Sequence, residues 1–335
     1  MIVPIILLIV GFALLIKGGD WFVDGATGIA RRFHLPEILI GATVVSIGTT
    51  LPEVMVSAGA ALQGSGSIAY GNAIGSIICN TSLIAALTIA IKPGAAARKS
   101  LVLPVAFFFI AAAVYCVSAY VLGTFSLLIG LVLLSIFVIY MVMTVLRMKN
   151  NATLSDELAS ETVTDEDHTS KSEADTAKDS LLKDIILLIV GAVVIAIGAD
   201  FLVDNAIIIA EQFGVSQKVI GLTIVALGTS LPELVTAITA LLKGHGSLSL
   251  GNIIGANLFN LVLVSGVAVT LNPFDVPVSG LVSGINSSLI IDIPVMLGVM
   301  LILTVPTLLK EKLSRWQGIL LLLIYASFCA LQFTI

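Results

Sequence analysis

The sequence predicts an all-α polytopic membrane protein in which ten transmembrane helices form two inverted five-helix repeats. Of its 335 residues, 58% are apolar and 11% are charged, and the mean hydropathy is +1.13. Soluble domains carry about 25% charged residues, so a soluble protein is excluded. Apolar runs close to the ~20 residues that cross a bilayer recur along the chain, and the two halves match in sequence.

Glycine, proline or charged residues separate the apolar runs and mark the ends of the expected helices. The first run continues beyond Lys17 and Asp20 and has no basic segment ahead of it, which favours a membrane span over a signal peptide. We expect the ten helices at about 2–30, 37–62, 68–91, 100–121, 124–146, 181–209, 217–242, 247–271, 283–309 and 315–334.

Lysine and arginine residues predict the orientation, because they concentrate in cytoplasmic loops. With both termini outside, only Lys218 lies in an external loop. The basic residues then expected on the cytoplasmic side are Arg31, Arg32, Lys92, Arg98, Lys99, Arg147, Lys149, Lys171, Lys178, Lys183, Lys243, Lys310, Lys312 and Arg315. We therefore expect an integral protein of the inner or plasma membrane.

One hydrophilic stretch, residues 150–180, separates the repeats at 1–149 and 181–335. It is rich in acidic residues and has few large apolar ones, so it cannot bury enough surface to offset the entropy of ordering. Its acids lack the spacing and the glycine of an EF-hand calcium loop. We expect a disordered, acidic, cytoplasmic linker.

The two halves repeat one another at an offset of 180 residues. VSIGTTLPE at 45–53 matches VALGTSLPE at 225–233, and Gly71-Asn72 matches Gly251-Asn252. Because each half contains an odd number of spans, equivalent helices cross the membrane in opposite directions. Inverted repeats are typical of secondary transporters, whose site lies near the membrane midplane at the repeat interface.

The second and seventh spans each place a glutamate, Glu53 or Glu233, in the middle of the bilayer. A charged group there costs about 2.5–3.5 kcal/mol, which calls for a compensating interaction. Pro52 and Pro232 precede the glutamates and leave backbone carbonyls free to turn toward a cavity. Neighbouring hydroxyl groups come from Thr49, Thr50, Thr229 and Ser230.

The third and eighth spans are expected to form the other wall of the site. Asn72, Ser76 and Asn80 share one helix face, and Asn252 and Asn260 repeat the pattern. The candidate donors are thus all oxygens, which hard cations such as Ca²⁺ and Na⁺ prefer. No histidine or cysteine accompanies them, which disfavours zinc, copper and iron.

Four further acids match at the same offset, Asp20 and Asp24 with Asp200 and Asp204. They lie toward the ends of their spans, and their symmetry suggests a shared structural or ion-entry role. Lys17 is expected to snorkel or to pair with Asp20.

The paired motifs GTTLPE (Gly48–Glu53) and GTSLPE (Gly228–Glu233), each followed by GNxIG, resemble the alpha repeats of the sodium/calcium exchanger family, prokaryotic type. This family belongs to the cation/calcium antiporter superfamily. The resemblance implies ten helices and alternating access, with several Na⁺ ions exchanged for one Ca²⁺. It also implies that Glu53 and Glu233 are ligands shared by the two ions.

By the same resemblance, Thr49, Thr50, Thr229 and Ser230 supply hydroxyl or carbonyl donors, and Ser76, Asn80 and Asn260 complete the sites. The chain departs from the family pattern at Ala256, where many members have serine. Asn260 stands where the potassium-dependent branch has aspartate, which argues against K⁺ cotransport.

An H⁺/Ca²⁺ antiporter using the same glutamates remains the alternative, and a passive cation channel is a more distant one. GxSxG and HExxH motifs are absent from the sequence, so we expect no enzyme activity. We expect Ca²⁺ and Na⁺ as substrates, with no prosthetic group. The lipid bilayer is the expected surrounding, with no nucleic acid and no obligatory protein partner.

Overall fold

The computed structural model describes residues 2–33, 35–162, 172–213, 226–278, 280–282 and 284–332. Among these residues, nine helices are long and apolar enough to cross a membrane, and a shorter apolar helix spans Leu231–Leu242. The predicted all-α polytopic class is therefore confirmed. The seventh expected span, 217–242, is described only from residue 226 onward.

The first half contains five long helical segments, and π-helical turns interrupt two of them and end a third. They are α1 (Ile2–Arg32); α2 (Glu37–Ile40), η1 (Gly41–Val45) and α3 (Ser46–Leu62); α4 (Gly66–Cys79), η2 (Asn80–Ala85) and α5 (Ala86–Ile91); α6 (Arg98–Cys116) and η3 (Val117–Leu122); and α7 (Leu127–Thr162).

The second half has a similar series of helical segments, except that in the fourth segment the π-helical turn precedes the α-helix. They are α8 (Ser172–Gln212); α10 (Ala226–Gly228) and α11 (Leu231–Leu242); α12 (Gly246–Phe259), η5 (Asn260–Val264) and α13 (Ser265–Leu271); η6 (Ser288–Asp292) and α14 (Ile293–Lys310); and α15 (Arg315–Gln332).

The internal repeat is visible in the element boundaries. Helices α4 and α12 begin and end 180 residues apart, and each continues directly into a π-helical turn, η2 or η5. The turns before them contain Gly64 and Gly244, with φ of +77° and +87°. Glycine adopts this left-handed conformation without a steric penalty, so both halves fold back sharply at the same point. These correspondences are consistent with the predicted inverted repeat.

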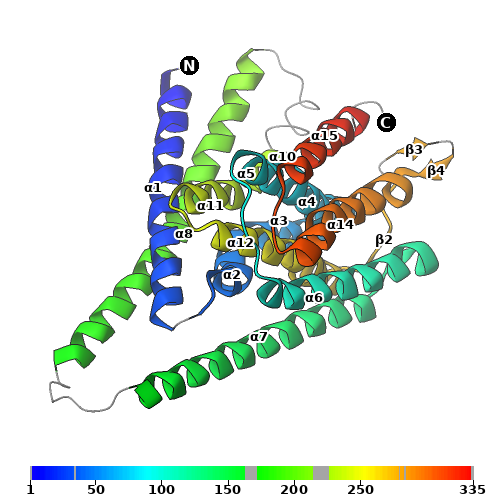
Figure 1. Ribbon diagram of the computed structural model, residues 1–335. Helices are drawn as coiled ribbons and strands as arrows, with labels where there is room; N and C mark the ends of the chain where they lie inside the picture. The colour runs from blue at the N-terminus through cyan, green and yellow to red at the C-terminus, as the bar shows by residue number, and fades with distance from the viewer. Residues whose placement is uncertain are drawn as a thin grey trace.

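Helices α1 and α8 lie side by side as a long pair beside the other helices (Figure 1). Glycines allow their backbones to approach closely: a Cβ at Gly11 would stand 2.9 Å from the Gly198 carbonyl oxygen. Small residues of this kind favour tight helix packing in membranes. The α1–α8 pair therefore packs through backbone contacts that larger side chains would prevent.

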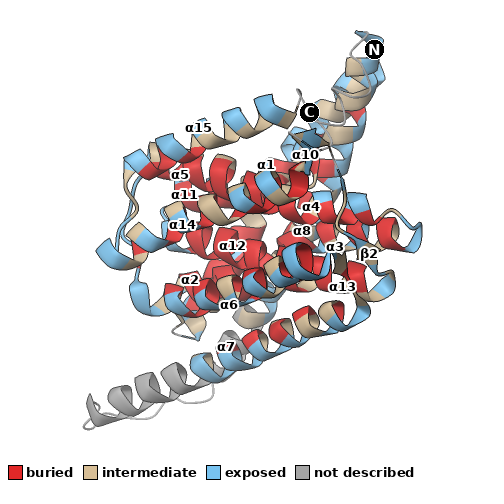
Figure 2. Ribbon diagram, turned by 90° about the vertical axis from the view of Figure 1, so that its right-hand side faces the viewer, coloured by how far each residue is buried: buried red, intermediate tan, exposed pale blue. Residues whose placement is uncertain are grey.

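Burial is greatest in the middle of the bundle, around α4, α11 and α12 (Figure 2). Large apolar side chains remain exposed on the outer helices, for example Ile9 on α1, Leu128 on α7 and Leu323 on α15. Exposed apolar surface of this extent suits lipid rather than water. The central helices are therefore shielded from lipid, and polar side chains on them need partners within the protein.

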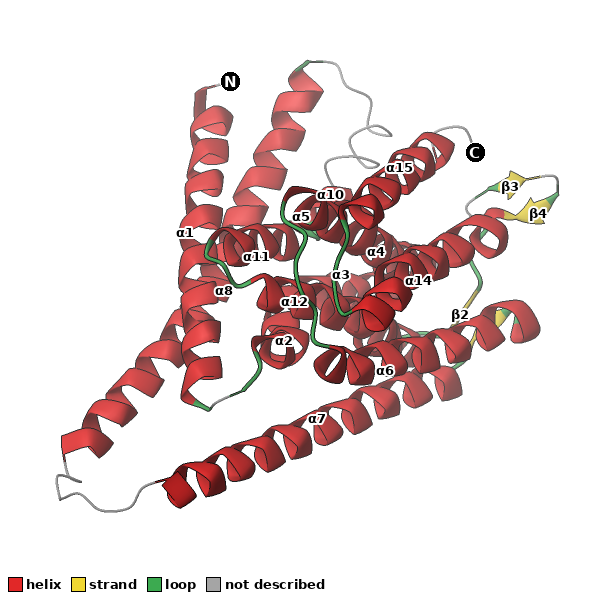
Figure 3. Ribbon diagram, in the orientation of Figure 1, coloured by secondary structure: helices red, strands yellow, loops and turns green. Residues whose placement is uncertain are grey.

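The described residues include four short strands outside the long helices, and Figure 3 labels β2, β3 and β4. β1 (Thr124–Phe125) pairs with β2 (Phe274–Asp275), and β3 (Leu281–Val282) pairs with β4 (Ile285–Asn286), both antiparallel. β1 occupies the start of the run expected to be helical from 124, and the helix begins instead at Leu127. The β1–β2 ribbon connects the loop before α7 in the first half to the loop after α13 in the second half.

The linker expected at 150–180 lies partly within helices, because α7 continues to Thr162 and α8 begins at Ser172. Extending an existing helix avoids the cost of nucleation, and Glu157, Leu158 and Glu161 have high helix propensity. Residues 163–171 lie outside the described residues. The assignment of 150–180 as a disordered linker stays a prediction.

Candidate cation-binding site

The side chains of Glu53 and Glu233 lie close enough to interact electrostatically, although they come from different halves of the chain. Both residues are 0% exposed. No described residue donates a hydrogen bond to any of the four carboxylate oxygens. A buried carboxylate without a partner is strongly unfavourable, so this pair calls for a cation or a proton.

Glu53 lies on α3, which passes through Pro52 without interruption. Pro52 does not unwind the helix; the irregular backbone lies upstream, in the π-helical turn η1. Thr49 and Thr50 precede Glu53 by four and three residues, so all three side chains share one helix face. The Thr50 hydroxyl is buried and has no hydrogen-bond partner among the described residues.

Glu233 is positioned differently, in the first turn of α11. The chain leaves helical conformation at Thr229 and Ser230, so here the helix is broken just before the proline. Pro232 is well placed in a first turn, because the N–H it lacks would have no intrahelical partner there. Ser230 is 1% exposed, and its hydroxyl is unpartnered within the described structure.

Thr229 is the least buried of the four candidate hydroxyl donors on the second and seventh spans. It is only half-buried, whereas its counterpart Thr49 is 2% exposed. The Thr49 side chain lies near the Glu233 carboxyl, and its hydroxyl donates to Oδ1 of Asn252 at 3.2 Å. The two threonines of the repeat thus occupy different surroundings.

Asn80 and Asn260 begin the π-helical turns η2 and η5. Both residues are 0% exposed. Neither the amide nitrogen nor the amide oxygen of Asn80 has a hydrogen-bond partner in the described part of the chain. Asn260 donates to the Ala256 carbonyl at 3.1 Å, which leaves its own amide oxygen unpartnered among those residues. π-Helical turns are rare and frequent at functional sites.

Asn72 and Asn252 make more contacts with the protein. Asn72 Nδ2 donates to the Glu53 backbone carbonyl at 3.1 Å and to Ser57 Oγ at 2.8 Å, tying α4 to α3. The Asn252 backbone carbonyl accepts a hydrogen bond from Ser46 Oγ at 3.0 Å, which joins α12 to the start of α3. These two asparagines therefore tie α4 and α12 to α3, the helix that carries Glu53.

Ser76, the remaining predicted ligand, is buried on α4 at 4% exposure. Its counterpart Ala256 is 0% exposed and has no hydroxyl to offer. Helix α12 also approaches η1 closely: a Cβ at Gly41 would stand 2.8 Å from the Asn252 backbone nitrogen. The close contact between α12 and the second span thus depends on glycine, which has no side chain, at position 41.

The structure adds buried polar residues that the sequence interpretation missed. Ser57 binds Asn72, and Thr236 is 0% exposed with a hydroxyl that is unpartnered among the described residues. Ser57 follows Glu53 by four residues and Thr236 follows Glu233 by three, so helical spacing could have identified both. Asn257 donates to Thr81 Oγ1 at 2.7 Å, a contact that helical spacing does not indicate.

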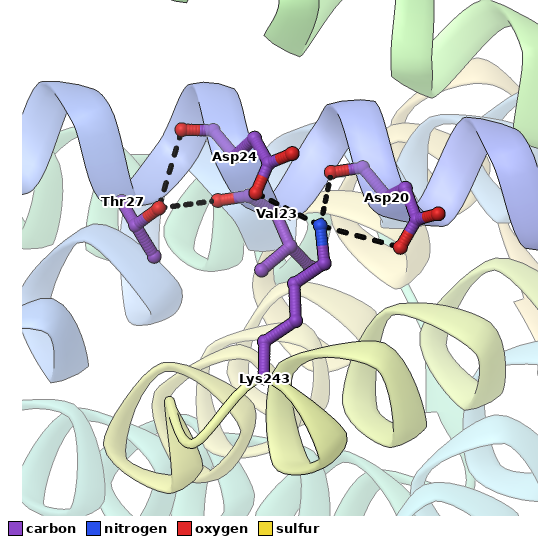
Figure 4. A network of polar contacts seen from close by, with 5 residues as sticks. All are labelled: Asp20, Val23, Asp24, Thr27 and Lys243. Atoms are coloured by element: carbon purple, nitrogen blue, oxygen red, sulfur yellow. Dashed lines mark hydrogen bonds and ion pairs between the residues drawn. The ribbon is translucent and has the colours of Figure 1, made fainter.

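Asp20 and Asp24 lie apart from the glutamates, in a network with Lys243 (Figure 4). Lys243 Nζ is 3.2 Å from Asp20 Oδ1 and 2.8 Å from Asp24 Oδ1. Partial burial lowers the pKa of Lys243, but the hydrogen bonds to Asp24 and Asp20 outweigh it and raise that pKa above its ordinary value. Lys17 instead stands over the Trp21 ring, 5.4 Å from its centroid.

The model of the family described as "Sodium/calcium exchanger protein" matches residues 3–146 and 183–334. The chain is 31% identical to sodium/calcium exchanger MaX1 of Methanosarcina acetivorans, covering 99% of each chain. It is 36% identical to an uncharacterized membrane protein of Methanocaldococcus jannaschii, covering 95% of this chain and 94% of that protein.

A solved structure of the sodium-calcium exchanger NCX_Mj, soaked with Na⁺ and Sr²⁺, is similar over 98% of both chains, with a TM-score of 0.77 and 33% sequence identity. Both halves of the sequence, with their GTTLPE and GTSLPE motifs, fall within the family match. The resemblance inferred from these motifs is therefore confirmed. The chain belongs to the sodium/calcium exchanger family.

Proposed function

We propose that this protein exchanges Na⁺ for Ca²⁺ across the membrane by alternating access at the Glu53–Glu233 pair. Membership of the exchanger family supports cation/calcium antiport. The observation that carries the assignment to this site is the pair of buried carboxylates, which interact electrostatically and whose oxygens have no hydrogen-bond partner among the described residues.

The oxygens available around the pair suit Ca²⁺, which takes six to eight oxygen ligands. Four come from the two carboxylates, and their two negative charges neutralise one divalent ion. Unpartnered oxygens within the described structure also come from Thr50, Ser230 and the amides of Asn80 and Asn260. A site of this composition selects hard cations over zinc or copper.

Competition between Na⁺ and Ca²⁺ for one site couples the movement of one ion to the movement of the other. Ca²⁺ and Na⁺ need the same two carboxylates, so binding one ion excludes the other. An empty site carries two buried negative charges, which disfavour the change between the outward-facing and inward-facing conformations. A bound cation neutralises these charges and permits that change. If more than two Na⁺ move per Ca²⁺, each net charge contributes about 2.3 kcal/mol per 100 mV.

The experiment is Na⁺-dependent uptake of ⁴⁵Ca²⁺ into proteoliposomes. Glu53→Gln and Glu233→Gln each remove one charge with little change in shape and should abolish uptake. Glu37→Gln is the matched control, because Glu37 stands at the start of the same span as Glu53 but pairs with His245. Wild-type uptake by Glu53→Gln would overturn the assignment.

H⁺/Ca²⁺ antiport is the second candidate, favoured by the same geometry. Two neighbouring carboxylates repel one another, and protonating one of them relieves that repulsion. Uptake driven by a pH gradient in the complete absence of Na⁺ would support this alternative. Uptake that needs Na⁺ at every pH would support Na⁺/Ca²⁺ exchange.

We also infer the orientation of the chain, with both termini outside and the 150–180 linker in the cytoplasm. The basic residues between the helices support it, because they gather in alternate loops. Reporter fusions at each terminus and in the linker test the arrangement. A cytoplasmic N-terminus would contradict it.

A further inference from the structure

A cavity of about 270 Å³ lies between the end of α5, the start of α12 and the loop before α15. Its lining includes Lys92, Gly94, Gly246, Ser247, Ser249 and Leu313, and it contains none of the predicted cation ligands. By the orientation inferred above, this end of the bundle faces the cytoplasm. The cavity is therefore separate from the cation site.

The N-terminus of α12 opens into this cavity. Gly246, its first residue, is exposed, and nothing described lies within 4 Å of the position a Cβ would take. The first N–H groups of a helix have no intrahelical partner, and the helix dipole adds a partial positive charge. Helix α12 has 14 residues and continues into η5, so it is long enough for the peptide dipoles to sum to a full helix dipole.

Ser249 provides independent evidence for a ligand. It lines the cavity and is 2% exposed, and its hydroxyl has no hydrogen-bond partner among the described residues. Side chains on a helix lean toward its N-terminus, so a side chain in the first turn leans toward the cavity. A buried hydroxyl without a partner is unfavourable, and a bound acceptor would relieve that cost.

The charge of the cavity favours an anion. Lys92 is exposed and is the charged residue among those that line the cavity. It makes no ion pair within the described part of the chain. Lys92, the Ser249 hydroxyl and the N–H groups of α12 are all hydrogen-bond donors. Phosphate, with several acceptor oxygens, matches such a set of donors.

The equivalent position in the first half lacks these features. Ala69 stands in place of Ser249, and Asn272 is the counterpart of Lys92. At the start of α4, a Cβ on Gly66 would stand 2.6 Å from the Phe274 Cβ, so the phenylalanine covers that helix N-terminus. The open, basic cavity, which residues of both halves line, therefore has no counterpart at the start of α4 and is not required by the shared repeat.

We propose that this cavity binds a phosphate group. Its volume suits a small anion or a lipid headgroup rather than a large ligand. A phospholipid headgroup and free inorganic phosphate share the same recognition chemistry. Anionic headgroups collect at basic pockets between transmembrane helices on the cytoplasmic side.

The test measures phosphate binding to the purified full-length protein in an uncharged detergent. Inorganic phosphate is titrated by calorimetry, and phosphatidylglycerol binding is followed by native mass spectrometry. Ser249→Ala and Lys92→Gln should each weaken binding about tenfold, the loss expected for a hydrogen bond to a charged group. Lys99→Gln is the matched control, because Lys99 lies near the same end of the bundle but does not line the cavity.

Binding of inorganic phosphate alone identifies the free anion, and binding of phosphatidylglycerol alone identifies a headgroup. If the wild type binds neither probe, or if both variants bind like the wild type, the proposal is wrong. Ser249→Ala should fold, because alanine occupies the equivalent position in the first half, and Lys92→Gln changes an exposed side chain. Glu53→Gln should retain phosphate binding, which separates this test from that of ion exchange.

Discussion

Glu53 and Glu233 stand 180 residues apart in the chain and bring their carboxyl groups together in the buried centre of the protein. The motif that carries each glutamate occurs once per half, so the pair forms only when both halves pack together. The pairing thus explains why the sequence repeats: one carboxylate from each half completes a single site.

Asn80 and Asn72 should respond differently to alanine substitution, although they share one helix face. Asn80→Ala breaks no hydrogen bond of the described structure and should weaken Ca²⁺ binding about tenfold while leaving thermal stability without ions unchanged. Asn72→Ala removes the hydrogen bonds from Asn72 to the Glu53 carbonyl and to the Ser57 hydroxyl and should lower stability by about 1–3 kcal/mol. Thermal unfolding with and without Ca²⁺ measures both effects. Equal effects of the two substitutions would contradict the distinction.

Alanine substitutions at Gly41 and Gly59 should change the stability of the protein in opposite directions. A Cβ at Gly41 would meet the backbone of α12, so Gly41→Ala should destabilise the protein by about 1–3 kcal/mol. At Gly59 on α3, no described atom lies within 4 Å of a Cβ, so Gly59→Ala should stabilise it by about 0.5–1 kcal/mol. Thermal unfolding of the two variants compares them directly. A higher Tm for Gly41→Ala than for the wild type would show that α12 does not pack closely there.

Lys243→Met should lower the free energy of unfolding by only about 0.2–1 kcal/mol, because its ion pairs with Asp20 and Asp24 are partly exposed. The folded-state pKa of Lys243 is raised, so this contribution is fully present below the pKa of the unfolded state. It is lost as pH rises through the folded-state pKa. Unfolding of the wild type and of Lys243→Met at neutral and strongly alkaline pH tests this. A stability difference that grows with pH would contradict it.

The amino-acid sequence is sufficient to predict the all-α polytopic class and the proximity of Glu53 and Glu233. The cost of a mid-membrane carboxylate next to a proline, repeated in both halves, leaves few explanations other than a shared site. The 180-residue offset also anticipates the matching boundaries of α4 and α12 and the paired turns at Gly64 and Gly244.

Other features depend on packing and do not follow from local pattern. The motif is nearly the same in both halves, yet α3 continues through Pro52 while the chain breaks before Pro232. The π-helical turns at Asn80 and Asn260 have no recognised sequence signal. Lys243 pairs with Asp20 and Asp24 across a tertiary contact, whereas sequence proximity had suggested Lys17 as the partner of Asp20.

Equilibrium binding of ⁴⁵Ca²⁺ to the purified protein tests the central claim most directly. The wild type and the Glu37→Gln control should bind Ca²⁺ and release it as Na⁺ is added, whereas Glu53→Gln and Glu233→Gln should each lose measurable binding. Wild-type affinity in either of the latter two variants would show that the carboxylate pair does not hold the cation.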